Sequence, residues 1–81
     1  MDNQEELYFL AMTDDNPNIR REVAGQLNDQ GGLIYLAMND EDAGVRAVAV
    51  DRLEDDSVLA YVSNVDEDSQ VRAAAIRRLG R

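Results

Sequence analysis

The chain repeats itself three times at a constant interval. The rows LYFLAMTDDNPNIRREVAGQL, LIYLAMNDEDAGVRAVAVDRL and LAYVSNVDEDSQVRAAAIRRL begin at Leu7, Leu33 and Leu59, and the second and third rows agree at 11 of 21 positions. A unit this short cannot bury its own apolar face, so it must stack on its neighbours. The 81 residues are therefore predicted to form one domain, 1–81, with repeats at 7–32, 33–58 and 59–81.

Each repeat is predicted to contain two helices joined by an acidic turn. In the first half of the second repeat, Leu33, Leu36 and Ala37 follow the i, i+3, i+4 spacing of one helical face, and the other repeats show the same pattern. The second half of each repeat carries an i, i+4, i+8 stripe that we expect to be buried. These stripes are Ile19, Val23 and Leu27; Val45, Ala49 and Leu53; and Val71, Ala75 and Leu79.

The turns contain residues that are typical of helix starts. Asn16, Asp42 and Asp68 stand at equivalent positions just before the three stripes, and Asn and Asp side chains accept hydrogen bonds from the first amides of a helix. Pro17 suits the first helical position. Because the connections are short, consecutive helices should run antiparallel. The sequence thus predicts an all-α fold of six antiparallel helices.

The repeated motif has an Asp, then Ile or Val five residues later, Arg directly after it, and Leu seven residues after the Arg. It is carried by Asp14, Ile19, Arg20 and Leu27; by Asp40, Val45, Arg46 and Leu53; and by Asp66, Val71, Arg72 and Leu79. The motif resembles the short bacterial HEAT-like repeat, and the leucine-rich-variant repeat is the second resemblance. The first resemblance implies a right-handed α-solenoid of three HEAT-like two-helix repeats.

The same resemblance implies a role for the repeated Asp and Arg residues. In such solenoids they are expected to form a ladder of charge-assisted hydrogen bonds that links adjacent units, and the rigid guanidinium fork of Arg suits this geometry. The Arg–Asp ladder would comprise Asp14, Arg20, Asp40, Arg46, Asp66 and Arg72. Since Arg46 lies in the middle unit, we expect Arg46→Ala to destabilise the chain more than Arg20→Ala.

Charge limits the classes of partner. The chain has 17 acidic residues, 8 Arg and a net charge of −9, which opposes direct binding to nucleic acid or to an anionic membrane surface. The charge favours another protein with a basic surface as the partner. The chain has no Cys and shows neither a secretion signal nor an apolar run long enough to span a membrane, so we expect it in the cytoplasm.

The residue types argue against catalysis. Without His, Cys or Lys, the chain lacks the usual general base, thiolate nucleophile and Schiff-base amine. Gly31 and Gly32 are expected to end a helix, since they lack the Lys-Ser or Lys-Thr that follows in a phosphate-binding loop. Asp40, Asp42 and Gly44 look like the start of a calcium loop, but the ligands that such a loop needs at its fifth and twelfth places are missing. We predict a non-enzymatic protein with no cofactor and no metal.

The leading functional prediction is an adaptor or regulator that binds another protein. Its binding surface would combine the acidic edge formed by the turns with aromatic residues of the first helices. The candidate residues are Tyr35, Tyr61, Asp15, Glu41, Asp42, Glu67 and Asp68. The competing interpretation is that each Tyr is half-buried with only its hydroxyl at the surface, and that the acidic residues only solvate the fold.

A second functional prediction is mimicry of nucleic acid. Three stacked units should span about 30 Å at about 10 Å per helix pair, and a DNA duplex carries about 18 phosphate charges over that length. The 17 carboxylates match that count. Such an acidic rod could inhibit a DNA- or RNA-binding complex, as anti-restriction and anti-CRISPR proteins of phages do.

The last helix is the third candidate surface. Residues 66–81 carry 3 acids and 4 Arg, a net charge of +1, whereas residues 1–65 carry a net charge of −10. The small side chains of residues 73–75 could receive another helix. The sequence therefore predicts that this helix forms either a homodimer contact or a docking surface, through Ala73, Ile76 and Leu79.

Overall fold

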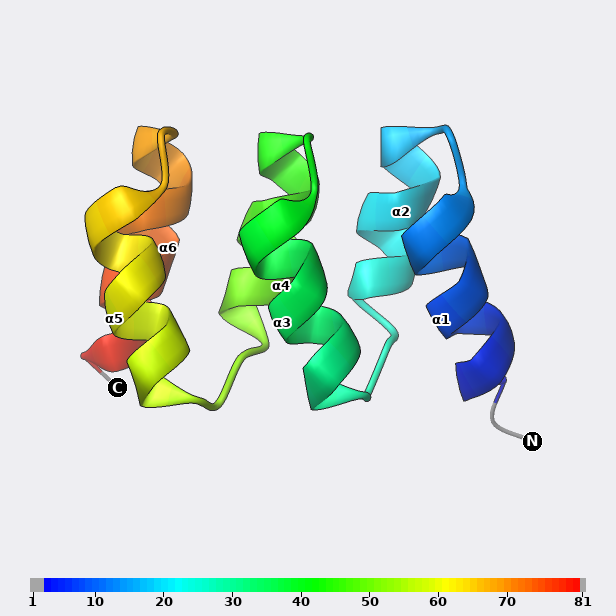
Figure 1. Ribbon diagram of the computed structural model, residues 1–81, viewed down its shortest axis with the longest axis horizontal. Coiled ribbons are helices and arrows are strands. Elements are labelled where there is room, and N and C mark those ends of the chain that lie inside the picture. Colours follow the sequence, from blue (N-terminus) through cyan, green and yellow to red (C-terminus); the bar gives the residue numbers. More distant parts are fainter. Residues whose placement is uncertain (1–2, 81) are drawn as a thin grey trace.

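The computed structural model describes residues 3–80 as an all-α fold with six helices and, within those residues, no strand. The helices are α1 (Gln4–Thr13), α2 (Pro17–Ala24), α3 (Gln30–Asn39), α4 (Ala43–Asp51), α5 (Asp56–Val65) and α6 (Ser69–Leu79). They form three antiparallel pairs, α1 with α2, α3 with α4, and α5 with α6 (Figure 1). None of the helices in the described part is long and apolar enough to cross a membrane.

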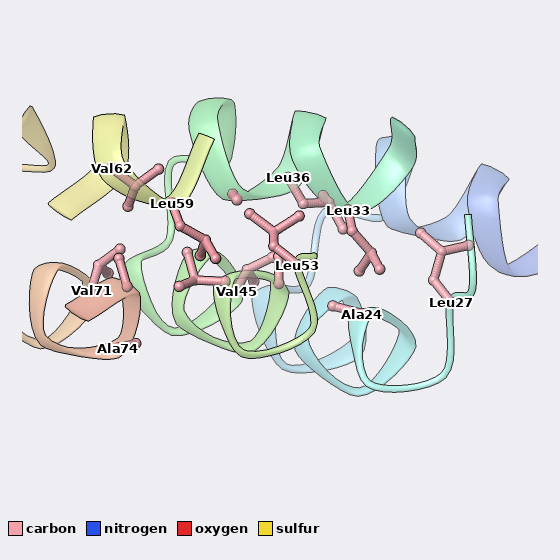
Figure 2. Packing of buried hydrophobic residues seen from close by; sticks show 14 of the residues in the cluster. Ala24, Leu27, Leu33, Leu36, Val45, Leu53, Leu59, Val62, Val71 and Ala74 are labelled. Carbon is pink, nitrogen blue, oxygen red and sulfur yellow. The ribbon is translucent and has the colours of Figure 1, made fainter. Parts of the chain in front are cut away.

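The three pairs lie side by side and make two layers. Helices α1, α3 and α5 form one layer, and α2, α4 and α6 form the other (Figures 1 and 2). Helix α4 packs against both α2 and α6, and α3 lies between α1 and α5. The described chain measures 34 × 23 × 14 Å along its principal axes, so the row of pairs sets its longest dimension.

The helix boundaries recur at the same positions of each sequence repeat. The first helices of the pairs begin at Gln4, Gln30 and Asp56, and the second helices begin at residues 17, 43 and 69, so both sets advance by one repeat from pair to pair. Asn16 accepts a hydrogen bond from the amide of residue 18 at 2.9 Å, and Asp42 and Asp68 cap α4 and α6 in the same way. These three predicted N-caps are confirmed, as is the place of Pro17 at the start of α2.

Two further caps were not predicted. Asp29 caps α3 and Asp55 caps α5. The expectation that Gly31 and Gly32 end a helix is wrong, because α3 begins at Gln30 and the Gly32 amide donates to the Asp29 carboxylate at 2.9 Å. A Cβ at position 32 would lie 3.1 Å from the side chains of Leu27 and Tyr8. Glycine therefore lets the start of α3 approach the first helix pair closely.

The core lies between the two layers (Figure 2). Its largest fully buried side chains are Leu27, Leu33, Leu36, Leu53, Leu59, Val45, Val50 and Val71. The predicted stripes are buried with two exceptions, since Ile19 and Leu79 are each 38% exposed. Both exceptions lie in the outer pairs, where the described chain supplies no further pair to cover them.

Candidate protein-binding surface

Adjacent helix pairs are joined by bidentate contacts between Arg and Asp. The Arg20 guanidinium donates to both carboxylate oxygens of Asp40, at 2.9 and 3.1 Å, and to the Asp14 carbonyl oxygen at 2.7 Å. Arg46 repeats this arrangement with the Asp66 carboxylate at 3.0 and 3.2 Å and with the Asp40 carbonyl oxygen at 2.8 Å. Each Arg therefore ties the turn of its own pair to the turn of the next pair.

In these contacts the positive charge of each Arg is paired with the negative charge of an Asp. The hydrogen bonds to Asp40 raise the pKa of Arg20 above its ordinary value, and those to Asp66 do the same for the pKa of Arg46. The Asp40 and Asp66 carboxylates also accept the amides of Asp42 and residue 68, each at 2.9 Å. Their side chains are only 6% and 8% exposed, so they contribute to the structure and offer little to a partner.

The row of Arg–Asp contacts is open at both ends. Arg72 donates to the Asp66 carbonyl oxygen at 2.6 Å, but no carboxylate of residues 3–80 forms an ion pair with it. The Asp14 carboxylate accepts the Asn16 amide at 2.8 Å, and no Arg of the described chain is paired with it. Within residues 3–80 the ladder thus has a guanidinium without a carboxylate partner at one end and a carboxylate without an Arg partner at the other.

A second set of arginines joins the pairs at the opposite ends of the helices. Arg52 donates to the carbonyl oxygens of Ala24, at 3.0 Å, and Leu27, and Arg78 donates to the Leu53 carbonyl oxygen at 2.7 Å. These two contacts were not predicted from the sequence, although the spacing of Arg52 and Arg78 by one repeat could have indicated them. Both edges of the row are therefore held by Arg side chains that bond across a pair boundary.

Two grooves lie between successive first helices, at the acidic edge. The groove between α1 and α3 has a volume of about 270 Å³ and is lined by Asp15, Tyr35 and Glu41, among others. The groove between α3 and α5 has a volume of about 480 Å³ and is lined by Glu41, Tyr61 and Glu67 in equivalent positions. Because Glu41 borders both grooves, each Tyr lies with two acidic residues from neighbouring turns.

The tyrosines are more than half exposed, at 52% for Tyr35 and 53% for Tyr61. The groove with the larger volume, between α3 and α5, is also lined by the apolar side chains of Met38 and Val65, which are 44% and 54% exposed. Neither residue was a sequence candidate, and only their place in the last turn of a first helix could have indicated them. This groove therefore offers apolar as well as anionic contacts.

The predicted acidic residues divide into two groups. Asp42 and Asp68 serve as N-caps, and Asp42 also contacts the Arg21 guanidinium at 3.4 Å. By contrast, the exposed side chains of Asp15, Glu41 and Glu67 form no ion pair within residues 3–80. These three carboxylates are the part of the acidic edge that is open to a partner.

Asp42 makes part of the stability of the chain dependent on pH. The hydrogen bond from the Val45 amide lowers the pKa of its carboxyl below the ordinary 3.8, and Arg21 adds to this effect. A depressed pKa gives stability that is complete above the unfolded-state value and is lost as the pH falls through the folded-state value. We expect Asp42→Asn, which keeps a capping side chain, to reduce the loss of stability on acidification. Urea midpoints at neutral pH and at about pH 3 would show this difference, and an equal loss of stability in the variant and the wild type would contradict it.

The last helix is covered more than the sequence suggests. Ala74 and Ala75 are 1% and 0% exposed, so the expectation that residues 73–75 present a row of small side chains to a partner is wrong for these two. They pack within the core because α6 lies against α4 and α5. Of the predicted contact residues, Ala73 is half-buried, while Ile76 is 59% and Leu79 38% exposed.

Residues 3–80, the acidic edge included, hold no group of three or more acidic side chains placed to bind a metal ion. Comparison of the chain with protein-family models, curated proteins and solved structures finds no match. The chemistry of the grooves and of the two ends of the row is therefore the basis for assigning a function.

Proposed function

We propose that the chain is a short right-handed α-solenoid of three HEAT-like repeats that acts in the cytoplasm as a non-enzymatic adaptor or regulator. Support for the architecture comes from helix starts that advance by one repeat from pair to pair and from Arg–Asp contacts that recur at each pair boundary. Repeat proteins of this kind present extended surfaces to other proteins. The partner would bind along the acidic edge, through the two grooves.

The observation that carries the proposal is the equivalence of the two grooves. Each combines an exposed Tyr ring with two acidic residues of neighbouring turns. The charges of Asp40 and Asp66 are balanced by Arg20 and Arg46, so the unbalanced charge lies on the outer carboxylates. A cationic side chain of the partner would gain both carboxylate contacts and the face of the Tyr ring. The grooves therefore suit a basic segment of another protein.

Binding of a fluorescent hexa-arginine peptide tests this proposal by anisotropy. We expect Glu41→Gln to raise the dissociation constant about fivefold, since an exposed charge pair contributes at most about 1 kcal/mol and Glu41 borders both grooves. Glu54→Gln removes the same charge from an exposed site outside the grooves and should change the constant less than about twofold. Equal effects of the two variants would mean that the peptide senses only net charge, and the groove proposal would fail.

The aromatic contribution can be tested in the same assay. Tyr61→Ala should weaken peptide binding by about threefold to fivefold, the value of an exposed cation–π contact. Tyr8→Ala is the matched control, because Tyr8 is also partly exposed, at 44%, but lines neither groove. Unchanged binding of the Tyr61 variant would remove the ring from the proposed site.

Nucleic-acid mimicry is the second candidate, favoured by the placement of the charges. Ion pairs with carboxylates neutralise three of the arginines, Arg20, Arg21 and Arg46. Exposed carboxylates remain at successive turns, on Asp15, Glu41 and Glu67. The 34 Å length of the described chain is close to the span expected for the mimic. A mimic should displace a duplex oligonucleotide from a linker histone, and this displacement should vanish steeply as salt rises. Failure to displace the duplex at low salt would exclude this candidate.

A further inference from the structure

The C-terminal end of the row exposes side chains that are buried at the same repeat positions elsewhere. Ile76 and Leu79 lie one repeat after Val50 and Leu53, which are both 0% exposed. In α6 the exposed fractions rise to 59% for Ile76 and 38% for Leu79. The exposure differs because α6, from the following pair, covers α4, whereas no following pair covers α6 in the described chain. This end therefore retains the side chains of an internal contact.

The N-terminal end retains the matching side of the same contact. Ile19 is equivalent to Val45 and Val71, which are 0% exposed in the second and third pairs, but it is itself 38% exposed. A terminal repeat that only faces water usually replaces such residues with polar ones. One replacement is present, since Glu22 stands at the position of Ala74, so a contact at this end would be weaker than an internal one.

The charges of the two ends are complementary. At each internal boundary an Arg of the earlier helix pair forms an ion pair with an Asp of the next helix pair, as Arg46 does with Asp66. Arg72 offers the same guanidinium at the C-terminal end, and Asp14 offers the same carboxylate at the N-terminal end. Each end thus presents the group that the other lacks.

We propose that the C-terminal end of one chain binds the N-terminal end of a second copy, head to tail, in the register of the internal boundaries. Arg72 would form an ion pair with the Asp14 carboxylate of the second copy. Ile76 and Leu79 would pack against Ile19 of that copy. A symmetric dimer through α6 would instead leave Asp14 and Ile19 uncovered. The proposal does not depend on the grooves, whose tyrosines and Glu41 lie between the pairs rather than at either end.

A head-to-tail contact leaves a free end after every addition, so assembly does not close. The weight-average mass measured by sedimentation equilibrium should rise continuously with protein concentration and show no plateau at the dimer. The measurement should be made at physiological ionic strength, because the net charge of −9 on each chain makes the copies repel one another at low salt. A monomer mass at every concentration would overturn the proposal.

Charge reversal distinguishes this contact from a symmetric one. Arg72→Glu and Asp14→Arg should each raise the dissociation constant by at least about tenfold, because like charges would then face each other. A mixture of the two variants should associate again, since the two introduced side chains meet at one contact and the native Arg72 meets the native Asp14 at the other. A dimer that forms equally well with Asp14→Arg, or a mixture that stays monomeric, would contradict the head-to-tail arrangement.

Folding controls keep these outcomes interpretable. Since Arg72 also bonds the Asp66 carbonyl oxygen, the helicity and melting temperature of its variant must be compared with the wild type. Ile76→Ser is the second test, because the exposed side chain can be shortened without opening the core, and it should also reduce association. Tyr61→Ala should leave association unchanged while it weakens hexa-arginine binding. If Tyr61→Ala weakens association, the head-to-tail contact is contradicted, and if it leaves hexa-arginine binding unchanged, the groove site is contradicted.

Discussion

Replacing Leu53 with Ala is expected to lower the free energy of unfolding by about 3–4 kcal/mol. Leu53 is fully buried and lies between the two helix layers with the other core side chains (Figure 2). Deleting most of its side chain removes apolar contacts and leaves a cavity that neighbouring helices can fill only in part. A domain of 81 residues has a total stability of about 4–12 kcal/mol, so this one change would remove a large share of it.

Leu79 provides a matched control for that variant. It occupies the same repeat position as Leu53, but it is 38% exposed. Leu79→Ala should therefore cost about 1 kcal/mol, since less apolar area is lost and water can fill the space. Guanidinium denaturation of both variants, monitored by circular dichroism at low protein concentration, measures the difference. Equal losses would show that position 79 is covered in solution or that position 53 is less buried than the structure shows.

Arg46→Ala is expected to cost about 3 kcal/mol. The variant loses a bidentate contact with Asp66 and a bond to the Asp40 carbonyl oxygen. It also leaves the Asp66 carboxylate, 8% exposed, with the Asp68 amide as a donor but without a counter-charge. The boundary between the second and third pairs should weaken as a result. The measured quantity is again the free energy of unfolding, extrapolated from urea titrations.

The other ladder arginines supply the comparison. Arg20 makes the same set of bonds as Arg46, so the structure removes the reason to expect Arg46→Ala to be the more damaging of the two. The contrast lies with Arg72, which has a single bond to a carbonyl oxygen. Arg72→Ala should cost only about 1 kcal/mol. If it proves as destabilising as Arg46→Ala, the cost of these variants does not come from the contacts between pairs.

The helices could be predicted from the sequence because their signals are local. An N-cap such as Asp42 acts on amides two or three residues away, and the apolar spacing of a helix face is contained within two or three turns. The predicted helices, the caps of α2, α4 and α6, and most of the buried stripes followed from these short-range rules. The caps of α3 and α5 were missed because Asp29 and Asp55 each stand in a polar segment with other residues that can cap a helix.

The candidate site was predictable only in part. Tyr35, Tyr61 and the acidic turn residues were candidates because they recur, but recurrence alone does not tell which carboxylates are paired. The repeat places an Asp and an Arg in every unit, yet Arg20 pairs with Asp40 of the next turn and uses only the carbonyl oxygen of Asp14 in its own turn. That choice depends on how far apart the helix pairs lie.

The amino-acid sequence by itself determined where the second helix of each pair begins, which face of each helix is apolar, and that the units repeat. Only the tertiary structure decided which side chains are covered. Ala74 is buried and Ile76 is exposed, while Met38 and Val65 line a groove. The physical reason is distance along the chain. Helix starts and apolar faces depend on neighbours within a few residues, whereas coverage and charge pairing join residues 20 or more positions apart, and these are set by how the pairs pack.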